Sequence, residues 1–135
     1  MAVEFPIFGG CFCGYVKYQI SEMPSSVGIC HCESCRRIAG AESVGWAVMN
    51  KDALSFTEGS TRDFRSSESV ERTFCERCGT TLTYHRDGRE LIDVTLATLD
   101  NPELLQPTKE TWCGERVSWN QLNDNLDHFE GSSSS

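Results

Sequence analysis

The stretch Cys75-Glu76-Arg77-Cys78-Gly79 lies in the middle of the chain and decides its fold. Two cysteines separated by two residues form a tight turn that directs both sulfur atoms to one point. The glycine that follows supplies the permissive backbone that such a turn needs. The stretch therefore predicts a zinc knuckle, which provides two of the four ligands of a structural zinc site.

A second short pair, Cys11 and Cys13, lies near the N-terminus and is also followed by a glycine. Four thiolates from the two pairs would form a closed, chemically quiet site. Such a site ties the N-terminal strand to the middle of the chain and contributes on the order of 10 kcal/mol to folding. We therefore expect Cys11, Cys13, Cys75 and Cys78 to hold a structural zinc ion.

Three more cysteines, Cys30, Cys32 and Cys35, follow one another within a single turn. Three protein ligands that leave a fourth position open are typical of a catalytic zinc. A site of three thiolates is soft, so it suits a thiol substrate, which loses its proton when it binds the metal. The alternative is that His31 or Cys113 supplies a fourth ligand and closes the site. The open site predicts two zinc ions per chain, one structural and one catalytic.

The composition disfavours two classes of function. The 135 residues carry 12 basic and 20 acidic side chains, and the net charge of −8 would repel nucleic acid. No run approaches the roughly 18 apolar residues of a membrane span, so no membrane partner is expected. The first ten residues lack a secretory signal, so we expect a cytoplasmic protein whose eight cysteines bind metal rather than form disulfides. The oligomeric state stays open, a homodimer included.

Alternating apolar residues predict a mainly β fold with little helix. The expected strands span residues 15–20, 44–49, 54–57, 70–74, 80–85 and 91–96. In the first of these, Val16, Tyr18 and Ile20 share one face. Asp87-Gly88 is a hairpin turn signal.

Only two short helical segments are expected. One spans residues 32–39 and ends at Gly40, and Pro102 opens a second, brief turn. We therefore expect one small antiparallel β domain over residues 2–129, followed by a disordered tail at 130–135.

Three stretches, residues 9–18, 30–40 and 72–80, resemble motifs of the glutathione-dependent formaldehyde-activating enzyme family, which includes centromere protein V. They read GGCFCGYVKY, CHCESCRRIAG and RTFCERCGT. Residues 99–102 and Trp119 match later landmarks of the family. The resemblance thus extends over nearly the whole chain and includes all seven motif cysteines.

The resemblance implies a β-tent fold with two zinc sites, the structural site held by the four paired cysteines and the catalytic site by the other three. It also implies condensation of formaldehyde with glutathione to S-hydroxymethylglutathione, formally a carbon–sulfur lyase reaction run in reverse. Many members carry a histidine shortly before the final tryptophan motif, where this chain has Glu110-Thr111-Trp112-Cys113. The exact substrate therefore stays open, and Cys113 is expected to be a buried thiol.

Four charged residues around the second cysteine group are candidates for substrate binding and proton transfer. Arg36 and Arg37 follow the group, and guanidinium groups bind carboxylates such as those of glutathione. His31 and Glu33 lie between the cysteines, where both could move a proton at the metal. For all four residues, the alternative is a solvent-facing side chain.

Three functions are compatible with these patterns. The first is a zinc-dependent carbon–sulfur lyase that acts on a glutathione–aldehyde adduct. The second is a zinc lyase or isomerase for another small metabolite on the same fold, and the third is a non-catalytic, zinc-stabilised binding module. An enzyme predicts an open metal position inside a pocket, whereas a binding module predicts a closed second site.

Overall fold

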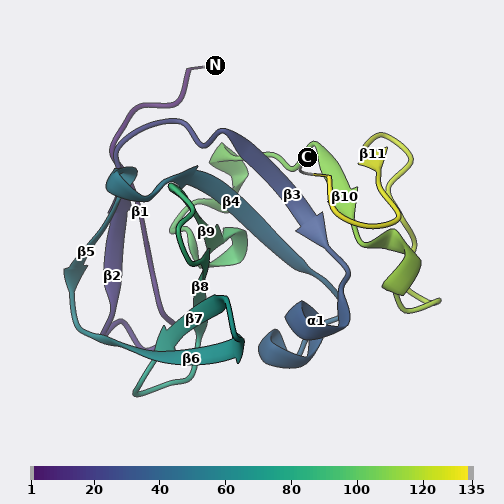
Figure 1. The fold of residues 1–135 in the computed structure, drawn as a ribbon. Coiled ribbons are helices and arrows are strands. Elements are labelled where there is room, and N and C mark those ends of the chain that lie inside the picture. Colours follow the sequence, from purple (N-terminus) through teal and green to yellow (C-terminus); the bar gives the residue numbers. More distant parts are fainter. Residues whose placement is uncertain (1, 134–135) are drawn as a thin grey trace.

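The strands within the described part of the chain form two sheets, whose arrangement Figure 1 shows. The computed structural model describes residues 2–133. The smaller sheet consists, in order, of β1 (Ile7–Gly10), β2 (Lys17–Ile20) and β5 (Leu54–Glu58). The larger sheet consists, in order, of β11 (Asp127–His128), β10 (Lys109–Thr111), β3 (Ser26–Cys30), β4 (Val44–Asn50), β9 (Leu91–Thr95), β8 (Thr81–Arg86), β7 (Val70–Cys75) and β6 (Thr61–Ser67).

Neighbouring strands are antiparallel except at one end of the larger sheet, where β10 is parallel to both β3 and β11. The chain reaches both parallel partners over long connections rather than hairpins, as parallel pairing requires. The predicted mainly β fold is confirmed. The parallel pairs at β10 are a departure from a fully antiparallel arrangement.

The main core contains residues from both sheets. Val16, Tyr18 and Ile20 are all buried, as their alternation predicts, although Val16 lies just before β2. On the larger sheet, Ala47 and Met49 are buried in the same core. Because successive side chains of a strand point to opposite faces, the residues that alternate with these two lie on the other face of the larger sheet. That face carries the cavity described below.

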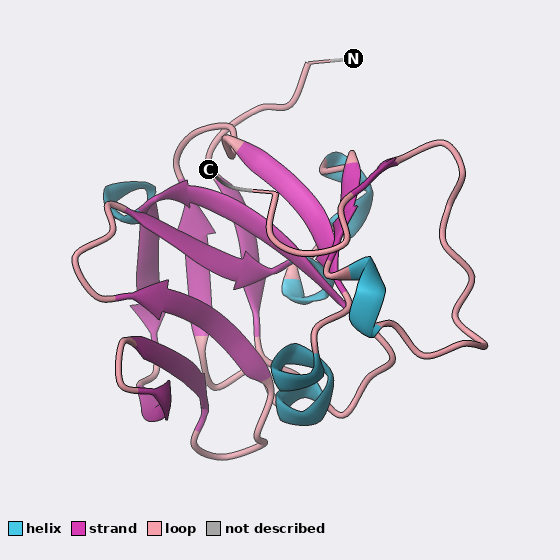
Figure 2. Ribbon diagram, turned by 45° about the vertical axis from the view of Figure 1, so that its right-hand side comes forward, coloured by secondary structure: helices cyan, strands magenta, loops and turns pink. Residues whose placement is uncertain are grey.

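Within residues 2–133 there is one α-helix, α1 (Glu33–Ala39), which ends where the sequence predicts and begins one residue later. Its N-cap is Cys32, whose Sγ accepts a hydrogen bond from the backbone N–H of Cys35, and its C-cap is Gly40 with φ of 63°. Glycine is favoured there because φ is positive. Figure 2 shows that the helical segments are short and lie at the margins of the strands. The 3₁₀ helices are η1 (Lys51–Ala53), η2 (Leu96–Thr98), η3 (Pro102–Leu104) and η4 (Cys113–Glu115).

The strand boundaries shift by one or two residues from the predicted ones, and five strands were not predicted. The first predicted strand begins at Lys17 rather than residue 15, and the last ends at Thr95 because Leu96 opens η2. The predicted turn at Asp87-Gly88 is confirmed, with φ of 78° at Gly88. The unpredicted strands are β1, β3, β6, β10 and β11.

The C-terminal residues 129–131 lie beside β10 and η4. Trp112 N donates to Gly131 O at 3.0 Å, and Cys113 N donates to Phe129 O at 3.0 Å. The predicted disordered tail includes Ser134 and Ser135, which lie outside the described residues. None of the helices within residues 2–133 combines the length and apolar character that a membrane crossing requires.

Candidate metal centres and active-site cavity

The four paired cysteines come together at one point. Cys11 and Cys13 follow β1, whereas Cys75 ends β7 and Cys78 lies in the turn before β8. Their sulfur atoms all lie within 4.8 Å of one another. The sequence thus identified a group whose two halves are more than sixty residues apart, because each half carries its own short spacing.

The spacing of these sulfur atoms fits zinc. Cys13 Sγ lies 3.6 Å from Cys11 Sγ and 3.8 Å from Cys75 Sγ. Four sulfurs at zinc–sulfur bonds of about 2.3 Å in a tetrahedron are about 3.8 Å apart. The first site therefore has both the donor chemistry and the size of a closed zinc site.

Backbone N–H groups surround the sulfur atoms of this first site. Cys11 Sγ accepts a hydrogen bond from Val16 N at 3.2 Å, and Cys75 Sγ accepts from Arg77 N and Cys78 N, both at 3.4 Å. Hydrogen bonds from the Thr80 side chain and backbone lower the pKa of Cys78 to about 5. Because the thiolate is the metal-binding form, these bonds favour the species that zinc needs.

The second group contains Cys30, Cys32 and Cys35, whose sulfur atoms also lie within 4.8 Å of one another. Cys30 ends β3, Cys32 caps α1 and Cys35 lies in its first turn. Within residues 2–133, no fourth histidine, cysteine or carboxylate joins this group. The arrangement offers a metal ion three sulfur ligands and leaves a coordination position without a protein ligand.

A buried arginine contacts this second group. Arg72, on β7, is 5% exposed, and its Nη1 lies 3.6 Å from Cys35 Sγ. Hydrogen bonds from the Cys30 and Cys32 thiols lower the pKa of Cys35 well below its ordinary value, and Arg72 lowers it further, against the effect of burial. This environment favours the thiolate form of Cys35, which is the form that binds a metal ion.

A cavity of about 550 Å³ lies over the larger sheet, and all three cysteines of the second group line it. This volume falls within the range of about 300–1,000 Å³ of small-molecule sites. Its basic side chains are Arg72, Arg86, Arg89 and Lys109, and its acidic ones are Asp93 and Glu115. The excess of cations makes the cavity suited to an anionic ligand, although the protein as a whole is acidic.

One row of directly paired residues forms part of the cavity floor. Across the sheet, Val48 pairs with Asp93, Asp93 with Tyr84, and Tyr84 with Arg72. The guanidinium of Arg72 lies 5.0 Å from the centroid of the Tyr84 ring, and Arg89 Nη1 is 2.9 Å from Asp93 Oδ1. Burial raises the pKa of Asp93 to about 6 despite the opposing charge of Arg89. The row places a carboxyl group in the same cavity as the three cysteines.

The sequence-predicted arginines and Glu33 lie outside the lining of the cavity. Arg37 is 78% exposed and forms an ion pair with Glu33 at 2.9 Å on the surface of α1. Arg36 Nε donates to the backbone oxygen of His31 at 3.3 Å. None of the three is among the residues that line the cavity.

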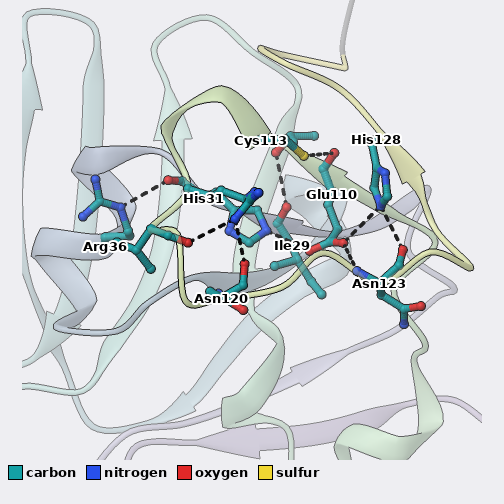
Figure 3. Close-up of polar contacts among 11 residues, drawn as sticks. Ile29, His31, Arg36, Glu110, Cys113, Asn120, Asn123 and His128 are labelled. Carbon is teal, nitrogen blue, oxygen red and sulfur yellow. Dashed lines mark hydrogen bonds and ion pairs between the residues drawn. The ribbon is translucent and has the colours of Figure 1, made fainter.

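The side chain of His31 lies in a buried polar network with Glu110, which Figure 3 shows. It is 1% exposed, and its Nε2 lies 2.8 Å from Oε1 of Glu110, itself 3% exposed. Oε2 of Glu110 accepts a hydrogen bond from Asn123 N at 2.7 Å and lies 3.3 Å from Nε2 of His128. His31 is therefore not the solvent-facing side chain that was the alternative to a proton carrier.

Cys113 belongs to the same network. It is buried, and its Sγ donates to the backbone oxygen of Glu110 at 3.5 Å. Neither Cys113 nor His31 is a member of either metal-binding group. The structure thus does not bring either of the two candidate fourth ligands to the second site.

Sequence reasoning missed Arg72, Asp93 and Glu110. Arg72 lies three residues before Cys75, and Asp93 alternates with apolar residues in a predicted strand, so both could be located in the sequence. What the sequence lacks is the order of the strands, which sets Asp93 and Arg72 two positions apart across the sheet. No sequence signal distinguishes Glu110, which lies on the unpredicted β10.

Comparisons with known proteins agree with this geometry. A curated protein of Schizosaccharomyces pombe (strain 972 / ATCC 24843), named an uncharacterized lyase, is 30% identical over 76 residues, which are 56% of this chain and 55% of that protein. The chain thus spans about half the length of this relative. A crystal structure of a Rhodobacter sphaeroides protein has a TM-score of 0.63 and 23% identity, and it covers 78% of this chain and 100% of its own, which supports the fold alone.

The family comparison covers most of the chain. The sequence profile of the glutathione-dependent formaldehyde-activating enzyme family matches residues 6–115, which contain both cysteine groups and the whole row from Val48 to Arg72. The chain belongs to the glutathione-dependent formaldehyde-activating enzyme family.

Proposed function

We propose that the protein is a zinc-dependent carbon–sulfur lyase-type enzyme that forms S-hydroxymethylglutathione from glutathione and formaldehyde, and cleaves it in reverse. The observation that carries the proposal is the group of three cysteine sulfurs, with no fourth protein ligand among the described residues, in the lining of a cationic cavity. Family membership supports the choice of substrates. The S. pombe relative is named a lyase, which supports the broader reaction class.

The two cysteine groups have different roles in this proposal. Cys11, Cys13, Cys75 and Cys78 hold a structural zinc, because four sulfurs leave no position for a substrate. Cys30, Cys32 and Cys35 hold the catalytic zinc. Bound there, zinc would bind the glutathione sulfur and favour its thiolate form at neutral pH.

In the synthetic direction, the sulfur of glutathione forms a bond to the carbonyl carbon of formaldehyde. The electron pair of the carbon–oxygen π bond moves to the oxygen, which takes up the proton that the thiol has lost. The cavity residues increase the rate by holding both reactants at the same place. The basic side chains Arg86 and Lys109 are suited to bind the two carboxylates of glutathione. Asp93 is suited to carry the proton, since its pKa of about 6 lies close to neutral pH.

Metal analysis and exchange NMR on one sample test this proposal. We expect two zinc ions per chain and an exchange between formaldehyde and S-hydroxymethylglutathione that is faster than the uncatalysed background. The matched control is Cys32→Ser, which should retain the first zinc and lose the acceleration. Two zinc ions without acceleration would contradict this substrate pair and leave a lyase or isomerase for another small metabolite. A single zinc would contradict the catalytic site.

A further inference from the structure

Arg72 is a buried guanidinium that has no carboxylate partner within residues 2–133. It is 5% exposed, and none of the ion pairs in this part of the chain includes it. A buried charge is costly unless an opposite charge lies close to it. Arginine also stays charged at any pH at which proteins fold. The negative charge that offsets Arg72 must therefore belong to a group that is not a directly paired carboxylate.

The contacts of Arg72 identify that group. Nε donates to Ser66 Oγ at 3.0 Å, the guanidinium lies 5.0 Å from the centroid of the Tyr84 ring, and Nη1 donates to Cys35 Sγ at 3.6 Å. Serine and tyrosine orient the guanidinium but carry no charge here. Asp93 lies one strand beyond Tyr84, and its carboxylate is paired with Arg89. Of these contacts, only Cys35 becomes negatively charged when it binds a metal ion, so its sulfur is the counter-charge of Arg72.

The contact between Arg72 and Cys35 affects the charge balance of the second site. A divalent ion with three thiolates carries one net negative charge, and a fourth thiolate would add another. The site lies in a partly enclosed cavity, where like charges repel more strongly than in water. Arg72 offsets one of the negative charges without occupying the open position, because it approaches a protein ligand rather than the metal.

We propose that Arg72 is a positioning residue of the second site: it donates to the sulfur of Cys35 and offsets the charge of the three sulfurs, so that the site accepts an anionic sulfur ligand from the cavity. This inference rests on the proposed function in its last step, the entry of a substrate thiolate. Its first step, the support of the three-thiolate metal site, does not depend on any substrate.

The first site provides an internal control. Its sulfurs accept hydrogen bonds from Val16 N, Arg77 N and Cys78 N, and no arginine side chain of residues 2–133 donates to them. The side chain of Arg77 stacks instead over the Tyr15 ring, with its central carbon 3.7 Å from the ring centroid. Loss of Arg72 should therefore change metal binding at one site only.

Metal affinity of the two sites, measured by cobalt titration with absorption spectroscopy and a competing chelator, tests the first step. In Arg72→Met, which keeps most of the apolar stem, we expect cobalt affinity of the second site to fall by about tenfold or more, as for other groups that support a metal ligand. Affinity of the first site should be unchanged. Arg72→Lys keeps the charge and should recover part of the loss, whereas Ser66→Ala should cause a smaller loss in the same direction.

Arg86→Met is the matched control, because it removes a cation from the same cavity, and no contact of Arg86 with a cysteine occurs among the described residues. We expect its cobalt affinity at both sites to be unchanged. Equal affinities in wild type and Arg72→Met, or an equal loss in Arg86→Met, would overturn the first step. A loss at both sites in Arg72→Met, without recovery in Arg72→Lys, would indicate a structural role and would also overturn it.

Glutathione titration of the cobalt-loaded proteins tests the second step. Binding of the thiol to cobalt adds a sulfur-to-metal charge-transfer band, and we expect glutathione affinity to fall by about tenfold or more in Arg72→Met. An unchanged affinity would overturn the role of Arg72 in accepting the anion. If wild-type cobalt protein shows no such band, the proposed function fails in its thiol-binding step, and the cobalt affinities still decide the first step for Arg72.

Discussion

The two cysteine groups differ in what surrounds their sulfur atoms. In the first group, four sulfurs come together, and those of Cys11 and Cys75 accept hydrogen bonds from backbone N–H groups in tight turns. In the second group, three sulfurs line a cavity, and one of them accepts a hydrogen bond from the side chain of Arg72. The proposed chemistry at the second group depends on the coordination position without a protein ligand.

The largest expected difference between the two sites is in stability. Cys75 is fully buried and contributes to the first site, so Cys75→Ser should lower the free energy of unfolding by about 5 kcal/mol or more, since structural zinc contributes about 10 kcal/mol. Thermal unfolding followed by circular dichroism measures this. If Cys75→Ser unfolds at the same temperature as wild type, the first site is not structural.

Cys32→Ser should lower the activity strongly and the stability only slightly. Serine is a favourable N-cap residue, so the substitution keeps a hydrogen-bond acceptor for the backbone N–H of Cys35 and removes only a metal ligand. We expect the exchange rate of the formaldehyde–glutathione adduct to fall at least about 100-fold, while the free energy of unfolding changes by less than about 1 kcal/mol. Cys32→Ala, which also removes the cap, separates the two effects. Equal destabilisation by Cys32→Ser and Cys75→Ser would mean that both sites are structural.

The second site also differs in having a buried carboxyl group in its cavity. The pKa of Asp93 is raised to about 6, so the folded protein keeps this proton to higher pH than the unfolded chain does. Ionisation of Asp93 therefore lowers the free energy of unfolding as the pH rises from about 4 to about 6.

Asp93→Asn keeps an oxygen acceptor for Arg89 but cannot ionise. Relative to wild type, its free energy of unfolding should increase by on the order of 2 kcal/mol between pH 4 and pH 6. Urea unfolding of both proteins across this range measures the difference, in which metal loss common to both cancels. A difference independent of pH would show that Asp93 ionises at its ordinary pKa.

The smallest expected effect concerns the anchoring of the substrate. The sequence favours Arg36 and Arg37 for this role, whereas the cavity lining favours Arg86. Arg86→Ala should raise KM for glutathione by several fold with little change in kcat, as for a lost surface charge contact. Arg37→Ala should leave KM unchanged, because this side chain is exposed and paired with Glu33. A rise in KM for Arg37→Ala alone would restore the sequence-based assignment.

The cysteine groups could be predicted from the sequence because each ligand pair or triplet is local. Cys75 and Cys78 share one turn, and Cys30, Cys32 and Cys35 share the start of one helix. The end of the helix could also be predicted, because glycine is favoured at a C-cap, where Gly40 adopts a positive φ. Local spacing and local backbone geometry are properties of the sequence itself.

The environment of the second site could not be predicted, because it depends on which strands are neighbours. Arg72 reaches Cys35 because β7 lies beside β8 in the larger sheet, with the start of α1 over the same face. The strand β6 was missed for a different reason. As an edge strand it exposes most of its side chains, and it therefore lacks the apolar alternation that identifies strands.

The most direct test of the difference between the two sites is cadmium-113 NMR of the protein with both sites filled, before and after addition of glutathione. Thiolate sites bind soft metal ions, so each site should give its own resonance. We predict that glutathione moves the resonance of the three-cysteine site and leaves that of the four-cysteine site in place. Two resonances that both stay in place, or a shift at the four-cysteine site, would contradict a closed first site and an open second one.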